Sequence, residues 1–372
     1  MQNKILRNAL ILLFCGYIFV FALLYIFLPA QDFSEKEKRV LAAFPEVSLE
    51  TVFNGTFESG FETWLSDHLP GRDAFVGMNS LYEQASGRNG LSGVIASGDR
   101  LFAAPEAFDP DAVARKCGFI NRLAEKTLLP VDMMIVPTAG YMYEDSLPAL
   151  HAGYHDSAVM EHIAASLAPS VNLIPLEGPL RAALSENLYY RTDHHLTARG
   201  SYEAASVYMD AIGKSLPAAN NYAIETVEGF YGSMYAKSGL WNTAPDDIEL
   251  WRSAALGNVT VSFDDRESAD SLFFTEHLSA MDKYPVFLDG NHGLVTIEND
   301  AGNGETLLIV RDSFGHCFAP FAADVYSRVT LVDLRYYRKG VSSLAADVAA
   351  DRILVLYGMD TFLTDTNFAW LT

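Results

Sequence analysis

The sequence predicts an α/β fold with a central, mainly parallel sheet, preceded by a membrane-spanning helix. Short apolar runs typical of buried strands alternate with helical segments from Val113 onward, which favours βαβ units. This alternation is clearest after residue 306, where three apolar runs are separated by two helical segments. At the other end of the chain, an unbroken apolar run extends from about Ala9 to Leu28.

Composition limits the classes of function. Of the 372 residues, 50% are hydrophobic and 12% aromatic, which allows a sizeable core and excludes global disorder. The formal net charge is −21. Because phosphate binding needs clustered Lys and Arg, this charge argues against a nucleic-acid partner. A solvated acidic surface is the simpler interpretation.

The N-terminal apolar run matches the thickness of a bilayer core. Lys4 and Arg7 precede it, which favours a cytoplasmic N-terminus and an exported remainder. A cleaved signal peptide is the alternative, but the run is long for one and residues 28–31 form a poor cleavage site. We therefore predict that residues 1–30 form a cytoplasmic start and an uncleaved transmembrane signal-anchor. Of the three cysteines, Cys15 lies inside the apolar run. Cys117 and Cys317 are expected to be buried free thiols, although their spacing leaves a disulfide open.

Residues 31–105 are predicted to form an N-terminal linker and helical extension. Residues 32–39 are interpreted as a short linker or a first helix, and residues 57–69 show helical periodicity. The helix ends at a Pro-Gly break, near Asp67, His68 and Arg72. We interpret these three residues as a charge network at a helix end rather than as a site.

Residues 106–372 are predicted to form the α/β domain, with a loop-rich insertion at about 216–300. Ligands of parallel sheets bind beyond the carboxyl ends of the strands, which makes Thr138 and Tyr141 near-site candidates, although a plain turn would explain them equally well. The expected strands are 131–136, 171–174, 259–263, 284–288, 307–310, 329–332 and 353–356, and the expected helices are 113–126, 158–167, 200–213, 314–323 and 341–350.

Two stretches carry the candidate chemistry. Asp193-His194-His195 lies between a strand-like run and a helix for which Thr197 is a plausible N-cap. Ser313 lies at a strand-to-helix turn, where its N–H could stabilise an oxyanion. A serine nucleophile needs a base and an orienting carboxylate, and residues two apart on an extended loop can converge. We predict His195 as the base and Asp193 as its partner, and we expect His194 to point elsewhere.

Other interpretations of these residues were weighed. Ser313 and its preceding Asp could simply cap the next helix. Asp193 and the two histidines could bind a metal, as Asp-His-His does in some phosphoesterases, but matching acidic motifs at other strand ends are missing. The prediction therefore includes no metal and no cofactor.

The sequence resembles the DHHW family, in which Asp193-His194-His195-Leu196 matches the signature except for the final Trp. Four further segments carry the resemblance: 67–72 (DHLPGR), 287–292 (FLDGNH), 311–314 (RDSF) and 333–337 (DLRYY). That family is similar to the alginate O-acetyltransferase proteins, which have SGNH-hydrolase-like domains. There an Asp-x-His pair precedes the nucleophilic Ser, and the same order occurs here.

The resemblance implies an SGNH-hydrolase-like three-layer fold and assigns roles. Ser313 becomes the acyl-accepting nucleophile, His195 the base and Asp193 its orienter. Asn291 is implied as an oxyanion donor, and Arg335 and Tyr336 as substrate-side residues, although core packing would also explain Tyr336. Two departures stand out: Leu196 replaces a Trp that could stack on a sugar, and Arg311 stands where ordinary SGNH enzymes have Gly.

These inferences combine into one hypothesis. The protein is expected to be an exported, membrane-anchored serine-dependent O-acyltransferase, most simply an O-acetyltransferase, at the bacterial cell surface. Its acceptor would be a cell-envelope or secreted polysaccharide, and the resemblance implies a multispanning membrane acyltransferase as acyl donor. A carbohydrate esterase of the same fold is one alternative, and a non-catalytic polysaccharide-binding or assembly protein is the other.

Overall fold

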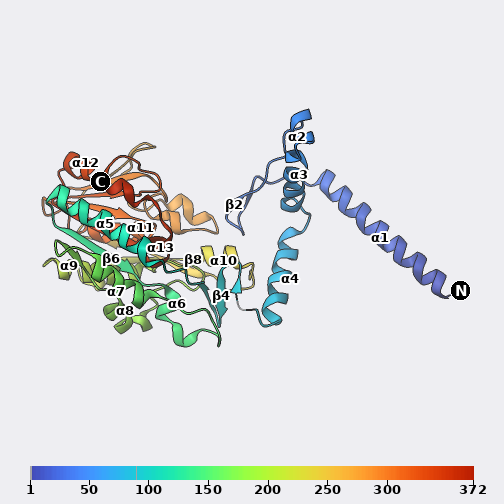
Figure 1. Ribbon diagram of the computed structural model, residues 1–372, viewed down its shortest axis with the longest axis horizontal. Helices are drawn as coiled ribbons and strands as arrows, with labels where there is room; N and C mark the ends of the chain where they lie inside the picture. The colour runs from blue at the N-terminus through green and yellow to red at the C-terminus, as the bar shows by residue number, and fades with distance from the viewer. Residues whose placement is uncertain (1, 89) are drawn as a thin grey trace. The chain divides into compact units, whose positions relative to one another are not determined.

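The computed structural model describes residues 2–88 and 90–372 (Figure 1). Its contacts divide the described chain into two compact units. One unit holds the residues up to Arg88 together with Gly239–Trp241, and the other holds the rest. The second unit contains the sheet and every residue of the predicted site.

A seven-stranded sheet forms the centre of the second unit, in the order β10-β11-β13-β12-β14-β6-β7. The five strands from β13 to β7 are mutually parallel, and β10 and β11 add an antiparallel edge. The predicted mainly parallel sheet is therefore confirmed. Its strands are β6 (Val131–Val136), β7 (Val171–Leu173), β10 (Val259–Phe263), β11 (Leu294–Asn299), β12 (Thr306–Arg311), β13 (Arg328–Val332) and β14 (Arg352–Gly358).

Both faces of the sheet are covered, which explains why the central strands β12 and β14 carry apolar residues at successive positions rather than at alternate ones. Along β12, Leu307 and Ile309 enter one core, and Leu308 and Val310 enter the other. Helices α9 (Ala198–Ala211) and α11 (Phe314–Ala323) contribute to the first core, and α5 (Pro110–Thr127), α7 (Asp156–Ser166) and α12 (Val341–Asp347) to the second. The result is a three-layer α/β/α arrangement.

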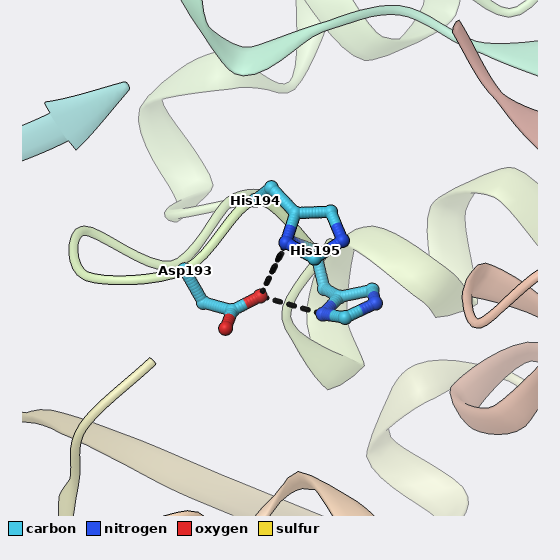
Figure 2. A group of neighbouring side chains, drawn as sticks. All are labelled: Asp193, His194 and His195. Atoms are coloured by element: carbon cyan, nitrogen blue, oxygen red, sulfur yellow. Dashed lines mark hydrogen bonds and ion pairs between the residues drawn. The ribbon is translucent and has the colours of Figure 1, made fainter. Parts of the chain in front are cut away.

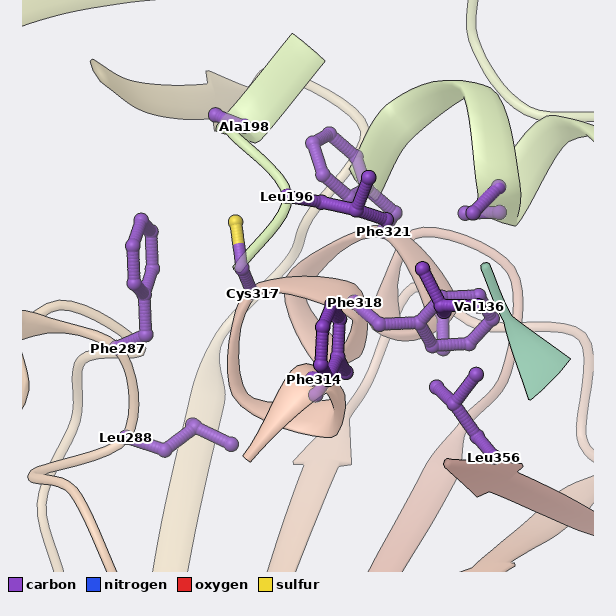
Figure 3. Close-up of a cluster of buried hydrophobic side chains, with 14 of the residues drawn as sticks. Val136, Leu196, Ala198, Phe287, Leu288, Phe314, Cys317, Phe318, Phe321 and Leu356 are labelled. Atoms are coloured by element: carbon purple, nitrogen blue, oxygen red, sulfur yellow. The ribbon is translucent and has the colours of Figure 1, made fainter. Parts of the chain in front are cut away.

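Helix α11 is buried along its whole length, which fixes the turn that precedes it. Figure 3 shows Phe314, Phe318 and Phe321 of this helix packed among side chains from neighbouring strands and from the start of α9. Leu196, the residue that departs from the family signature, is buried in this core and 3% exposed. This position therefore offers no surface for a sugar to stack on.

The two buried cysteines are both free, as predicted. Cys117 lies on α5 in one core and Cys317 on α11 in the other, so the sheet separates them. Burial raises the pKa of the Cys117 thiol to about 11 and that of Cys317 to about 12. Both are therefore inert packing residues at neutral pH.

The loop-rich insertion holds more regular structure than the sequence indicated. The 259–263 strand is confirmed, but the 284–288 strand is wrong: Tyr284–Val286 is a 3₁₀ turn, and Phe287 only bridges to Phe273. Pro285 explains this, because proline cannot donate to a strand ladder. The insertion also contains the unpredicted hairpin β8 (Tyr222–Phe230) and β9 (Asp246–Ser253), and the helix α10 (Ser233–Ser238). The second unit begins with a small sheet, formed by β3 (Gly90–Leu91), β4 (Val94–Ser97) and β5 (Arg100–Ala103).

Three short α-helices and a terminal 3₁₀ turn also belong to the second unit, together with several other 3₁₀ turns in its loops. The three helices are α6 (Ala139–Met142), α8 (Glu177–Ala182) and α13 (Met359–Thr364), and the terminal 3₁₀ turn is Asn367–Leu371.

The first unit begins with α1 (Gln2–Phe27), whose 24-residue stretch Lys4–Phe27 is long and apolar enough to cross a membrane. It is the one such helix among the described residues. Residues 32–39 do not form a helix: β1 (Phe33–Ser34) and β2 (Arg39–Val40) pair there instead. The unit also contains α2 (Leu49–Phe53), α3 (Thr56–Asp67) and α4 (Arg72–Ala85).

The charged residues at the end of α3 form the predicted structural network. Arg39 donates two hydrogen bonds to the buried carboxylate of Asp67, which also accepts from the backbone N–H of Ala42. The pKa of Asp67 is lowered, chiefly by the Arg39 hydrogen bonds. Arg72 pairs with Glu37. This network ties α3 to the β1–β2 hairpin.

Candidate active site

The loop from Tyr190 to Thr197 is closed at its base by backbone hydrogen bonds. Tyr190 N–H donates to His195 O, and Thr197 N–H donates to Leu188 O. Thr197 caps α9 by accepting from Gly200 N–H at 3.1 Å, as predicted. A short loop closed in this way holds its side chains on a rigid base.

Asp246 of β9 clamps the same loop from the other side. One of its oxygens accepts from Arg191 N–H at 3.0 Å, and the other accepts from Thr192 N–H and Thr192 Oγ1 at 2.8 and 2.6 Å. Thr192 O in turn accepts from two backbone N–H groups of α10. Sequence reasoning missed this clamp, because it joins residues about fifty positions apart.

One carboxylate oxygen of Asp193 faces two imidazole rings, those of His194 and His195 (Figure 2). Its Oδ1 accepts from His195 N–H at 3.0 Å and from His195 Nδ1 at 2.5 Å, and its Oδ2 accepts from Ser233 N–H at 2.6 Å. We expected His194 to point away from this carboxylate, and this expectation is wrong. Its Nδ1 lies 3.3 Å from Asp193 Oδ1 and 2.8 Å from Ser233 Oγ. Its ring also lies against that of His195.

Ser313 lies directly after β12 and immediately before α11. Its Oγ is 2.7 Å from His195 Nε2. Because the Nδ1–H of His195 is donated to Asp193, Nε2 carries the lone pair that can accept the proton of Ser313. We call the hydrogen-bonded series Ser313, His195 and Asp193 the relay. The fold thus brings together residues 118 positions apart in the sequence.

Asp312 holds the turn that carries Ser313. One of its carboxylate oxygens accepts from Phe314 N–H at 2.9 Å, and the other accepts from Gly358 N–H at 2.8 Å, at the end of β14. Burial raises the pKa of this carboxyl, and the two backbone donors oppose that rise. The residue before the serine therefore caps the turn and joins it to the neighbouring strand.

Tyr284 is another residue of this site that sequence reasoning missed. Its ring is stacked on that of His195, with centroids 4.0 Å apart and an angle of 10° between the planes. Its hydroxyl donates to the backbone carbonyl of Ser313 at 3.2 Å. One buried side chain therefore contacts both the base and the residue that carries the hydroxyl.

The three residues assigned by resemblance alone, Asn291, Arg335 and Tyr336, lie near one another and are at least partly exposed. Asn291 is exposed, and its Oδ1 is 3.5 Å from Arg335 Nη2. Arg335 forms a close ion pair with the buried Asp333 at 2.6 Å and lies 5.5 Å from the ring of Tyr336. Tyr336 is 55% exposed, so core packing does not explain it. No described contact joins these residues directly to the relay.

A buried ion pair involves Arg311, which lies two residues before Ser313 on β12. Arg311 is fully buried and donates to His316 Nε2 at 2.5 Å and to Asp333 at 3.3 Å. Burial and the nearby guanidinium hold the pKa of His316 well below its usual value, so its imidazole is neutral. The absence of a side chain at Gly315 leaves space for Arg311, since a Cβ there would lie 2.8 Å from the Arg311 side chain.

Two further features adjoin the relay. The ligand atoms of Asp193, His194 and His195 lie within 4.8 Å of one another, which is close enough to hold a metal ion. In this arrangement, however, His195 Nε2 faces Ser313.

A narrow hollow beside Asp193 and His194 is lined by Thr138, which places that near-site candidate as expected.

Comparison with known proteins agrees with this description. The model of the DHHW protein family matches residues 37–126 and 130–332, so the chain belongs to the DHHW family. No curated protein sequence matches the chain.

Solved structures show the same fold. A DHHW family protein from Eubacterium siraeum is 24% identical, with a TM-score of 0.67 over 75% of this chain and 95% of that one. Bacillus cereus PatB1, solved with a sulfonyl adduct, is 17% identical, with a TM-score of 0.65 over 75% and 98%. The predicted three-layer α/β fold with a mainly parallel central sheet is confirmed.

Proposed function

We propose that this DHHW protein is an extracytoplasmic O-acyltransferase that transfers an acyl group, foremost acetyl, to a cell-envelope or secreted polysaccharide. The observation that carries the proposal is the relay: continuous hydrogen bonds run from Ser313 Oγ through His195 to Asp193. This arrangement of hydroxyl, imidazole and carboxylate is the one that nucleophilic acyl transfer needs.

In the first half-reaction, Ser313 Oγ attacks the carbonyl carbon of the acyl donor while its proton passes to His195 Nε2. Asp193 stabilises the resulting imidazolium through the 2.5 Å contact with Nδ1. The tetrahedral intermediate then collapses, the donor's leaving group takes the proton from Nε2, and the acyl group stays on Ser313 as an ester.

The tetrahedral intermediate carries a negative oxygen that needs donors. The backbone N–H of Ser313 is one proposed donor, since it lies at the start of the ten-residue helix α11. The side-chain amide of Asn291 is the second. Arg335 lies near the Oδ1 of Asn291, so that the Nδ2 group of Asn291 would donate to the negative oxygen.

In the second half-reaction, a sugar hydroxyl loses its proton to His195 Nε2 and attacks the ester. Ser313 leaves as the alkoxide and recovers that proton. Water in place of the sugar would make the protein an esterase, so transfer requires a well-held acceptor. The exposed ring of Tyr336 and the guanidinium of Arg335 are proposed to contact that acceptor.

The setting of the reaction is part of the proposal. The apolar stretch Lys4–Phe27 would anchor the chain, with the α/β unit outside the cytoplasm. The acyl donor would then be supplied through the membrane, by a multispanning acyltransferase. Family resemblance suggests this partner.

Turnover of p-nitrophenyl acetate by the full chain in detergent tests the proposal. We expect nitrophenol release by the wild type, loss in Ser313→Ala and a severe fall in His195→Ala. Ser343→Ala is the matched control, because Ser343 is an exposed serine on α12, outside the relay. Addition of neutral or anionic oligosaccharides then separates transfer from hydrolysis, since only transfer gives an acetylated sugar.

One combination of results would contradict the proposed enzymatic function. No release by the wild type, together with no labelling of Ser313 by a sulfonyl fluoride or fluorophosphonate, would favour a non-catalytic polysaccharide-binding protein. A sulfonyl reagent is a suitable probe, because PatB1, which shares the fold, was solved with a sulfonyl adduct.

A further inference from the structure

Helix α4 of the first unit carries an exposed apolar face. At 100° per residue, six apolar residues fall within one 120° arc of the helix, without a charged residue among them. Four of them are large: Phe75 is 41% exposed, Met78 57%, Leu81 41% and Tyr82 72%. Ala74 and Ala85, both also exposed, complete the arc. Contiguous exposed apolar surface of this kind marks an interaction site.

The opposite face of α4 is the one that packs within its own unit. Ser80 is buried, and a Cβ at Gly239 would lie 2.4 Å from its Oγ. A Cβ at Gly77 would lie 3.8 Å from Trp241. Because the short segment 239–241 already occupies this side, the apolar arc is turned away from the protein that α4 packs on.

The membrane-spanning helix reaches α4 at one end of the apolar arc. The rings of Phe21 and Phe75 lie 6.4 Å apart, and those of Tyr25 and Trp64 lie 6.3 Å apart. Tyr25 also donates a hydrogen bond from its hydroxyl to Leu65 O on α3. Phe21 and Tyr25 are partly covered, whereas most of α1 is exposed.

These contacts set the depth of α4. Phe21 is six residues before the end of α1 at Phe27, which corresponds to about 9 Å along the helix axis. A span of 24 residues is about 36 Å long, roughly 6 Å more than the hydrocarbon core of a bilayer. Phe75, beside Phe21, is therefore held within several ångströms of the outer boundary of that core, close to the interface where Trp and Tyr are enriched.

We propose that the apolar face of α4 lies in the interfacial region of the lipid bilayer, as a second membrane contact beside the spanning helix. Lipid is the occupant that the geometry favours, because the spanning helix itself contacts the face. Arg72, Asn79 and Glu83 lie on the edge beyond Phe75, where they can meet headgroups and water. The proposal rests on the membrane anchor of the proposed function, and it adds a surface that binds lipid directly.

The experiment uses the full chain reconstituted at low density in phosphatidylcholine–phosphatidylglycerol vesicles. A nitrobenzoxadiazole label is placed at Met78→Cys, in a Cys15→Ser background, and quenched by lipids with doxyl groups at shallow or deep positions. Gln84→Cys is the matched control, an exposed position about 120° around the helix from Met78 toward the packed side. The native Cys15, in the middle of the span, reports on the anchor.

We expect the label at position 78 to be blue-shifted and quenched most strongly by shallow doxyl groups, while the label at position 84 stays in water. The label at Cys15 should be quenched most strongly by deep doxyl groups. Deep quenching at Cys15 with none at position 78 would overturn the proposal and leave the anchor standing. A blue shift at position 78 without doxyl quenching would also overturn it, since a second protein copy would then cover the face. Loss of quenching at Cys15 would overturn both.

Discussion

Tyr284 stacks on the imidazole of His195 and donates a hydrogen bond to the backbone carbonyl of Ser313. The two contacts use different parts of the side chain, the ring and the hydroxyl, so substitutions can separate them. Tyr284 is buried, and burial raises the pKa of its phenol well above 10, so it acts only as a neutral donor. It is a positioning residue for the relay rather than a reacting group.

Tyr284→Phe keeps the stacked ring and removes the hydrogen bond to Ser313. We expect kcat for p-nitrophenyl acetate to fall by up to about tenfold, in line with a net hydrogen bond of about 0.5–1.5 kcal/mol. Tyr284→Leu also removes the stacked ring and should lower kcat further. Both should leave KM nearly unchanged. A loss that appears in KM or only in thermal stability would show that Tyr284 merely packs.

Asp193→Asn tests the orienting carboxylate. An amide can no longer both accept from His195 Nδ1–H and stabilise the imidazolium, so kcat should fall by about 10³- to 10⁴-fold. Asp99→Asn is the matched control, an exposed carboxylate that pairs with Arg191 at the outer side of the same loop. Equal activity of Asp193→Asn and the wild type would remove Asp193 from the mechanism.

Gly232 should not tolerate a side chain. A Cβ there would lie 2.3 Å from Asp193 Cβ and 2.4 Å from Thr192 O, so the loop would have to move. Gly232→Ala is expected to lower both the melting temperature and the activity. Gly178→Ala is the control, because its Cβ would meet nothing within 4 Å and helix α8 should gain slightly. A fully active, equally stable Gly232→Ala variant would contradict the close packing at Asp193.

Asp360 gives a prediction about pH. Burial, with Asp156 and Glu106 nearby, raises the pKa of its carboxyl from 3.8 to about 7. A raised carboxyl pKa means that the charged form destabilises the fold, a cost present above about pH 7 and absent below about pH 4. Asp360→Asn should therefore raise the melting temperature at pH 8, by at least about 2 °C, and make little difference at pH 4. A difference that did not depend on pH would count against the buried charge.

Local patterns predicted the relay well. Asp193 and His195 are two residues apart on one loop, and Ser313 follows an apolar strand and precedes a helix, so each role has a local signal. The parallel strands were equally clear, because strands buried on both faces are continuously apolar. Strand β11 was missed, since Leu294–Asn299 alternates polar and apolar residues next to turns.

The support of the relay was not predictable in this way. Asp246 and Ser233 reach the Asp193 loop from the insertion, and Tyr284 reaches His195 from a 3₁₀ turn that was expected to be a strand. These contacts depend on how distant segments pack, and no spacing within the sequence encodes them. His194 was misplaced for a related reason: Ser233 draws its ring back toward Asp193.

The most direct measurement of the central claim is the intact mass of the full chain after brief exposure to an activated acetyl ester, followed by peptide mapping. The account predicts one added acetyl group, located on Ser313, that disappears when an acceptor or water turns it over. Ser313→Ala should carry none, and His195→Ala should form it far more slowly. An unmodified wild type, or an acetyl group on another residue that persists in Ser313→Ala, would contradict the account.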